Sequence, residues 1–451
     1  MNEQISKKDL INQLLLAFNI AYSNLQEIKG VNVTLFKFRP KIGVRIAKIR
    51  NLKDELASAL GVPFVRIIAP MEDGSIGIEV PNSKRKVLPA SIIFNSMSFQ
   101  NTAMQLPCAL GKTAANEIFI ADLTEMPHLL VAGATGQGKS VGLNLIIMSL
   151  LQKKKPDELK LVLIDPKKVE FSVYSSLENS YLACPVITDA EEAQRKLESI
   201  CSLMNERYDL LTKACVRNIQ EYNAHSKVEK MPYIVTVIDE YGDLIMTADK
   251  KMEQTICRIA QKARAVGIHL IIATQRPNTK IVTGNIKANF PARIAFRTSS
   301  GNDSRIILDQ MGAENLTGKG DMFFLDGNGA IRMQCAYASI EDIRATCDEI
   351  NKKYDGCYSP FSLPECPIEK AQQTLSDIQC QIREEMEARE RAFWEEQQKK
   401  YEEEKAHKRY MEEHKEEIKA RRERLYRHFY GSNTSYMTLY IPHESKIRKK
   451  K

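Results

Sequence analysis

The chain has 451 residues, 43% hydrophobic and 7% aromatic, which are the fractions of a globular protein with a sizeable core. Its 65 basic and 57 acidic residues leave a formal net charge of +8, a mild bias that permits a polyanionic partner without requiring one. The ten cysteines form no C-x-x-C pair and the seven histidines no H-x-x-x-H pair, which argues against a zinc site and predicts reduced thiols in the cytoplasm.

The first hundred residues predict a small α+β domain over residues 1–104. The apolar stretch LINQLLLAFNIAY is interrupted by Asn12, Gln13 and Asn19, so it predicts an amphipathic helix rather than a membrane span or a signal peptide. A second helix is predicted at NLKDELASAL, because its leucines share one face. Three β-type runs accompany these helices, at VNVTLFKF, VRIIAP and SIGIEVPN.

In residues 105–340 the sequence pattern changes, and apolar strands alternate with loops and long helices. Near-continuous apolar runs of this kind are typical of strands that are buried on both faces of a parallel sheet. The range therefore predicts an α/β domain with a parallel sheet covered by helices. The runs that carry this prediction are HLLVAG, LKLVLID, YIVTVID and IHLIIAT.

Residues 341–451 predict a linker, a long charged helix and a basic tail. Alternating Glu and Lys or Arg residues favour a solvated helix stabilised by i,i+4 ion pairs. Met411, Ile418 and Leu425 recur every seven residues, but a coiled-coil seam is the weaker interpretation because too few clean heptads are present. The terminal SKIRKKK is either a solvated end or a contact for nucleic acid.

A glycine-rich motif follows the strand HLLVA and precedes an apolar helix, which is the setting that a phosphate-binding loop requires. Gly133, Gly138, Lys139 and Ser140 fit the pattern G-x-x-x-x-G-K-[ST]. Backbone N–H groups and the helix N-terminus attract phosphates, Lys139 reaches the β- and γ-phosphates, and Ser140 offers an oxygen to Mg²⁺. The predicted nucleoside triphosphate site comprises Gly133, Ala134, Thr135, Gly136, Gln137, Gly138, Lys139, Ser140 and Val141.

Polar residues end two further apolar strands. Asp239 and Glu240 follow YIVTVI, where Asp239 is predicted to hold Mg²⁺ through its water shell and Glu240 to orient or deprotonate the attacking water. The alternative for an acidic pair at this place is helix capping. Gln275 follows IHLIIAT and is predicted either to sense the γ-phosphate or to serve as a hydrogen-bonded loop residue.

Seven blocks in order and spacing resemble the motor of the FtsK/SpoIIIE family of bacterial DNA translocases, and upstream blocks resemble the small domain that precedes that motor. The resemblance covers roughly residues 30 to 340. The upstream blocks are GVRIAKIRNLKDELASAL, VRIIAP and IGIEVPNSKRK. The motor blocks are GATGQGKSVGLN, LIDPKKVEF, VIDEYGDLIM, RIAQKARAVGIHLIIATQRP, TGNIKANFPARIAF, SSGNDSRIILDQMGAENL and GKGDMFFL.

The resemblance implies a RecA-like P-loop ATPase that uses ATP and Mg²⁺ and assembles as a hexameric ring to move double-stranded DNA. An arginine of the neighbouring subunit completes such sites, and Arg264 and Arg305 are the two candidates. Arg276 and Lys287 match the DNA-facing loops of the family, and Lys280 adds charge between them. Either arginine could instead be a structural ion-pair partner, and exposed lysines are often merely solvated.

Three departures from the family pattern bear on biology. Gly301 stands in a segment where relatives often carry a basic residue, and neither membrane-spanning helices nor a winged-helix module are recognised. The expected location is therefore the cytoplasm, with membrane association only through a partner protein of division or conjugation. Chromosome segregation in cell division and mobile-element DNA transfer both fit. The alternative functions are a conjugative coupling or type VII secretion-like ATPase and, less favoured, a non-enzymatic scaffold.

Overall fold

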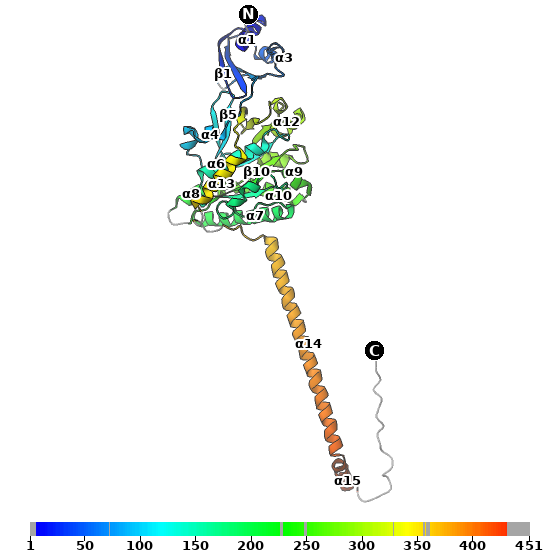
Figure 1. The fold of residues 1–451 in the computed structure, drawn as a ribbon. Coiled ribbons are helices and arrows are strands. Elements are labelled where there is room, and N and C mark those ends of the chain that lie inside the picture. The colour runs from blue at the N-terminus through cyan, green and yellow to red at the C-terminus, as the bar shows by residue number, and fades with distance from the viewer. Residues whose placement is uncertain are drawn as a thin grey trace. The chain divides into compact units, whose positions relative to one another are not determined.

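The computed structural model describes residues 6–430 except 72, 226–228, 248–249, 328, 355–356 and 358–360, and omits the side chains of 250, 367–382, 426 and 429–430. The predicted basic tail therefore lies outside the described residues. The chain divides into two units, Met1–Glu369 and Lys370–Lys451 (Figure 1).

The small domain consists of a four-stranded antiparallel sheet and three helices. The predicted α+β arrangement is confirmed, and Leu52, Leu56 and Leu60 are buried in its core. The edge strand β1 escaped prediction because its sequence YSNLQEIK is polar and largely exposed. The elements are α1 (Lys7–Ala17), β1 (Tyr22–Lys29), β2 (Val33–Pro40), α2 (Ile46–Arg50), α3 (Lys53–Ala59), β3 (Arg66–Ile68) and β4 (Ile76–Pro81), with the sheet order β1-β2-β4-β3.

A nine-stranded sheet forms the larger domain, in the order β6-β5-β13-β12-β11-β7-β10-β9-β8. The five strands from β11 to β8 are parallel, and they include all four predicted apolar runs. The predicted parallel sheet is thus present, and the other four strands extend it with antiparallel pairs. The strands are β5 (Pro107–Thr113), β6 (Ile118–Asp122), β7 (His128–Ala132), β8 (Leu159–Ile164), β9 (Tyr233–Ile238), β10 (Ile268–Thr274), β11 (Ala292–Phe296), β12 (Asp321–Leu325) and β13 (Ala330–Cys335).

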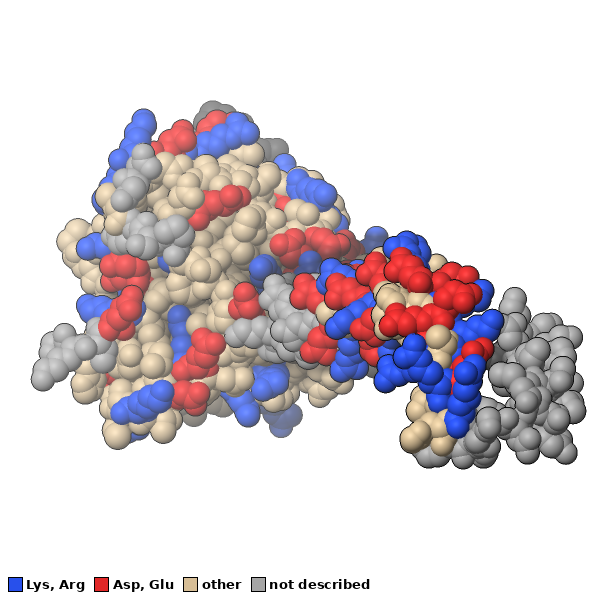
Figure 2. Space-filling view, turned by 90° about the horizontal axis from the view of Figure 1, so that it is seen from below, with Lys and Arg blue, Asp and Glu red and all other residues tan. Residues whose placement is uncertain are grey.

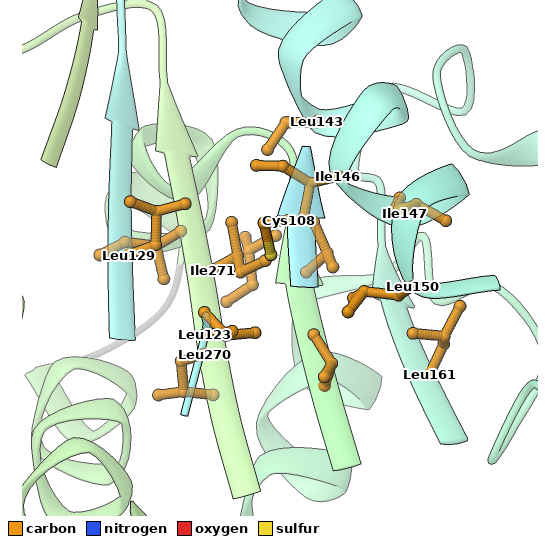
Figure 3. Packing of buried hydrophobic residues seen from close by; sticks show 14 of the residues in the cluster. Cys108, Leu123, Leu129, Leu143, Ile146, Ile147, Leu150, Leu161, Leu270 and Ile271 are labelled. Atoms are coloured by element: carbon orange, nitrogen blue, oxygen red, sulfur yellow. The ribbon is translucent and has the colours of Figure 1, made fainter. Parts of the chain in front are cut away.

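Helices cover this sheet, and α6 (Lys139–Lys153) is buried over most of its length. Figure 3 shows leucine and isoleucine side chains of α6 packed against Leu129, Leu161 and Ile271 of the parallel strands. Each such side chain contributes about 1.5–3 kcal/mol when fully buried. The remaining helices of the domain are α4 (Ala90–Phe94), α5 (Met97–Gln100), η1 (Ser172–Leu177), α7 (Ala190–Lys213), α8 (Ile219–Ala224), α9 (Tyr241–Thr247), α10 (Lys250–Lys262), η2 (Ala263–Val266), α11 (Gly284–Asn289), α12 (Gly301–Leu308), η3 (Ala313–Asn315) and α13 (Ile340–Tyr354).

Helix α13 lies beyond the predicted end of the α/β domain at residue 340. Ile343, Cys347 and Ile350 are nevertheless buried in the same core cluster as the sheet, and α13 contacts η1 and α6. Apolar burial of this kind is what holds an element to its domain. We therefore propose that the domain extends through α13.

Buried charges join the small domain to the large sheet. Arg332 of β13 contacts Glu79 of β4 at 3.1 Å and Asp321 of β12 at 2.7 Å, and these three side chains are at most 3% exposed. Glu79 also pairs with Arg66 of β3 at 3.2 Å. Because both carboxylates are bonded to guanidinium groups, the charges compensate one another inside the protein.

A chain of hydrogen bonds forms a second connection between the small domain and the larger one. The Asn32 amide of the small domain donates to the side-chain oxygen of Gln334, and the Gln334 amide donates to the Lys319 carbonyl at 3.0 Å. The next residue, Gly320, donates its N–H to the Gln137 carbonyl at 2.9 Å. Asn32 and Gln334 are almost fully buried, so the chain is shielded from water.

Two long helices follow, α14 (Pro367–Glu413) and α15 (Lys415–Tyr430). Their described side chains are mostly exposed, and Figure 2 shows both signs of charge mixed over them. Lys400 and Glu396 form a predicted i,i+4 ion pair at 2.8 Å. Within the described part of the chain, no helix combines the length and the apolar character that crossing a membrane requires.

The buried histidines of β7 and β10 predict acid sensitivity. Burial lowers the pKa of His128 to about 3 and that of His269 to about 4, from an ordinary value of 6.5. Below pH 6.5 the two histidines therefore bind protons in the unfolded chain but stay neutral in the folded one. Their contribution to the free energy of unfolding is complete above pH 6.5 and falls as the pH drops from there towards 4. Urea unfolding between pH 7.5 and 5 measures this slope. His128→Gln, which keeps an acceptor for the Leu270 N–H, flattens it; an unchanged slope in this variant contradicts the assignment.

Candidate nucleotide-binding site

The predicted phosphate loop follows the carboxyl end of β7 and leads directly into α6, with Gly138 as the N-cap at φ +119°. At two positions of this loop, Gly133 and Gly138, the surrounding atoms leave room only for glycine. A Cβ on Gly133 would lie 2.6 Å from Phe296 Cβ, and one on Gly138 would lie 2.8 Å from the Gly320 nitrogen. The tight turn therefore brings the amide groups at the start of α6 together, where they can bind an anion.

Neighbouring strands hold the loop in place. The Gly133 N–H donates to the Thr274 carbonyl at 3.3 Å, and the Ala134 N–H donates to the Arg297 carbonyl at 2.9 Å. Thr135 donates its hydroxyl to the Gln275 side-chain oxygen at 2.9 Å. The loop is thus tied to the ends of β10 and β11, and Gln275 lies beside it.

Lys139 and Asp239 meet in the interior although 100 residues separate them. The Lys139 ammonium donates to both the carbonyl and the carboxylate of Asp239, each at 2.6 Å, and the two side chains are 3% and 1% exposed. Burial raises the pKa of Asp239, and the charge of Lys139 opposes this rise. The second carboxylate oxygen, Oδ2, is buried without a hydrogen-bond partner in the described structure.

Glu240 is held by donors from two directions. Its carboxylate accepts from the Thr274 hydroxyl at 2.8 Å, the Gln275 N–H at 3.1 Å and the Lys167 ammonium at 3.3 Å. Lys167 also lies 3.5 Å from Asp243. Burial alone would lower the pKa of Lys167, but the nearby carboxylates of Glu240 and Asp243 outweigh it, so the pKa is raised. Glu240 is therefore a fixed, paired carboxylate at the same sheet edge as the phosphate loop.

Lys167 and Glu170 are site residues that the sequence analysis did not name. Ser140 donates its hydroxyl to Glu170 at 2.6 Å. Asp165, at the end of β8, accepts from the N–H groups of Lys167 and Glu170 at 3.1 and 2.8 Å, which folds the loop between them. The available signal was an apolar strand, LKLVLI, that ends in an acid in the same way as the strand before Asp239.

The oxygens present fit Mg²⁺. Ser140 offers a hydroxyl and Asp239 a carboxylate oxygen without a protein partner, and hard cations prefer such ligands. The described residues contain no cluster of three or more metal-binding side chains. Protein sites commonly hold Mg²⁺ through one or two side chains together with substrate phosphates, and Ser140 and Asp239 would supply such side chains.

Neither of the two predicted arginines hydrogen-bonds to the phosphate loop in the described structure. Arg264, in η2, is exposed and pairs with Glu125 at 3.4 Å. Both residues precede parallel strands, β10 and β7, so they lie at the sheet edge opposite the phosphate loop. Arg305 is exposed on α12. The structure therefore places Arg264 away from the phosphate loop of its own chain.

The predicted DNA-contacting residues occupy the region after β10. Arg276 and Lys280 are exposed in the loop that follows the strand. Lys287, on α11, pairs with Asp309, which also pairs with Arg293 at 2.6 Å. Two of the three predicted cations are therefore open to a ligand, whereas Lys287 is already partnered.

The glycine-rich loop after the central parallel strand β7, with carboxylates at the ends of the parallel strands β9 and β8, defines the fold of a RecA-like P-loop NTPase. The FtsK/SpoIIIE family model matches residues 91–279, and the FtsK alpha domain model matches residues 1–82. The chain belongs to the FtsK/SpoIIIE family.

Two curated relatives illustrate the similarity. DNA translocase FtsK of Chlorobaculum tepidum is 44% identical over 77% of this chain and 44% of its own length. DNA translocase SpoIIIE of Bacillus subtilis is 39% identical over 83% of this chain and 50% of its own length. The chain thus spans about half the length of the curated relatives it matches.

A solved structure supports the fold. The pCW3 conjugation coupling protein TcpA, in its monomer form with ATPγS, superposes with a TM-score of 0.55 at 25% identity. The match covers 77% of this chain and 98% of that one.

Proposed function

We propose that the protein is an ATP-driven translocase of double-stranded DNA. The observation that carries the proposal is the buried ion pair of Lys139 and Asp239, with the buried Glu240 next in the chain, at the phosphate loop of an FtsK/SpoIIIE family member. Each group has a role in phosphoryl transfer, and the curated relatives are named DNA translocases.

The roles follow from position. Lys139 binds the β- and γ-phosphates, and the loop amides cradle them. Glu240 orients the attacking water and accepts its proton, while Gln275 lies close enough to the loop to sense the γ-phosphate. Ser140 and Asp239 would hold Mg²⁺, which when bound withdraws charge from the phosphate oxygens.

The assembly we propose is a hexameric ring, cytoplasmic, with any membrane association supplied by a partner protein. Arg264 lies at the sheet edge opposite its own phosphate loop, so it could complete only the site of a neighbouring copy. Arg305 is the second candidate for that role. Charge stabilisation by an arginine from a neighbour is a general device of such enzymes.

Arg276 and Lys280 are the proposed DNA contacts, because exposed cations on a loop grip phosphates without reading bases. Lys287 contributes less net charge while it is paired with Asp309. A role in chromosome segregation during cell division or in mobile-element transfer follows from this activity.

The test is ATP hydrolysis with and without long duplex DNA. We expect DNA to stimulate hydrolysis, and Lys139→Ala to abolish both basal and stimulated rates because the phosphates lose their cation. Lys213→Ala, at an exposed lysine on α7, is the matched control and keeps the wild-type rates. An ATPase that ignores DNA, or a Lys139→Ala variant as active as the control, refutes the proposal.

A conjugative coupling ATPase is the second candidate, and the similarity to TcpA favours it. In that case a protein or nucleoprotein substrate, rather than bare duplex DNA, raises the rate of hydrolysis. The same assay with both kinds of substrate separates the two functions.

A further inference from the structure

The long helix α14 carries a row of large apolar side chains that nothing covers in the described structure. This first row consists of Met386, Phe393, Trp394 and Tyr401, which are 55–68% exposed. Because seven residues make nearly two full turns, the spacings of seven and eight residues put the row on one face of the helix. Single exposed apolar residues are common on proteins, but a row of four on one helix face marks a place for a partner.

A second row with the same repeat lies further along the chain. It consists of Met411, Ile418 and Leu425, and Met411 and Leu425 are 40% and 51% exposed. Helical hydrogen bonds continue from α14 into α15, because the His414 N–H donates to the Tyr410 carbonyl at 3.0 Å and the Ile418 N–H donates to the His414 carbonyl at 2.9 Å. Each row alone is too short for a coiled coil, but the two rows have nearly the same length.

The charges around the two rows are unevenly divided. Residues 383–404, around the first row, contain nine glutamates and five arginines or lysines. Residues 405–427, around the second row, contain nine arginines or lysines and five glutamates. The two segments thus carry formal net charges of −4 and +4. Two copies side by side attract each other when their helices run in opposite directions, whereas like segments face and repel each other when the helices run the same way.

We propose that the two rows form the interface of an antiparallel pair of α14–α15 helices from two copies of this chain. The first row of each copy packs against the second row of the other. Met386 then faces Leu425 of the second copy, and Phe393 and Trp394 face its Ile418. One chain cannot bring its own two rows together, because they follow one another on helices joined by a single residue. The inference goes beyond the proposed function and does not depend on it.

The test uses Trp394, the only tryptophan of the chain, as a probe inside the proposed interface. Tryptophan fluorescence of the full chain is measured while its concentration is raised, and sedimentation counts the copies. We expect the emission to shift to shorter wavelength as pairs form, because the indole ring leaves water. Raising the ionic strength from about 0.1 M to about 1 M is expected to raise the concentration at half-pairing about tenfold, since screening weakens the attraction between unlike segments.

An Ile418→Lys variant separates this pair from other ways of covering Trp394. Ile418 lies 24 residues beyond the tryptophan, about 36 Å along a helix, so it reaches the indole ring only through a second copy. We expect the variant to need at least about tenfold more protein for the same shift, because each pair would bury the new charge twice. Ala420→Lys adds the same charge at an exposed position on the opposite face of α15 and keeps the wild-type behaviour.

Three results would each overturn the proposal. The first is a tryptophan that stays exposed to water at every concentration. The second is a shift that Ile418→Lys leaves unchanged, which would mean that another surface covers the tryptophan. The third is pairing that strengthens with salt, which would mean that the helices run in the same direction. None of these measurements involves ATP or DNA, so a failure here leaves the proposed function standing.

Discussion

Replacing Glu240 by glutamine is expected to lower the rate of ATP hydrolysis by about 10²–10⁴-fold while ATP still binds. Glutamine has the same shape and can still accept from Thr274 and Gln275, so the loop geometry is kept. It loses the negative charge and the basicity needed to take a proton from water. Steady-state hydrolysis and ATP binding, measured on the same preparation, check both halves of this expectation.

Asp243 supplies the control for that variant. It pairs with Lys167, the lysine that Glu240 also contacts, but it is 37% exposed and forms no hydrogen bond with Thr274 or Gln275 in the described structure. Asp243→Asn is therefore expected to change the rate by less than about tenfold. Equal losses in the two variants would mean that the charge balance around Lys167 matters, and that Glu240 is not the base.

Replacing Glu79 by alanine is expected to destabilise the protein by about 3–5 kcal/mol. The change leaves the Arg332 guanidinium buried with only Asp321 as a carboxylate partner, and it also removes the partner of Arg66. The free energy of unfolding in urea measures the loss. Because the pair bridges β4 and β13, the small domain should lose protection from proteolysis first.

An exposed ion pair gives the comparison for Glu79. Glu221 pairs with Arg217 at 2.8 Å on the surface, where the arginine side chain is 89% exposed. Glu221→Ala should cost less than about 1 kcal/mol, because water screens and replaces such pairs. A loss in Glu79→Ala no larger than this would show that the buried network contributes little.

The part of the site that could be predicted from the sequence lies at strand ends. Lys139, Asp239 and Gln275 each follow an apolar strand, and parallel strands bring their carboxyl ends to one edge of the sheet. The structure places these residues together as that rule requires. Lys167 and Glu170 escaped prediction because a turn around Asp165, rather than a strand, directs them to the site.

The four antiparallel strands of the sheet also escaped prediction, because their local sequence does not show which strands they pair with. Strands β5, β6, β12 and β13 carry polar residues such as Arg332 and Asp321, whose burial depends on partners far away in the chain. Glu79 and Arg332 are 253 residues apart, and no local pattern pairs them. The roles of Arg264, Arg305 and the DNA-contacting loop depend on surfaces outside one chain, so they stay predictions.

The hydrogen-bond chain from Asn32 through Gln334 and Gly320 to Gln137 has a mechanical consequence. Such bonds tolerate only a few tenths of an ångström of stretching before they weaken. A larger shift of the phosphate loop must either break one of these hydrogen bonds or move the sheet of the small domain with it. We therefore expect nucleotide binding at the proposed site to be coupled to the position of the small domain, which contributes none of the proposed catalytic groups.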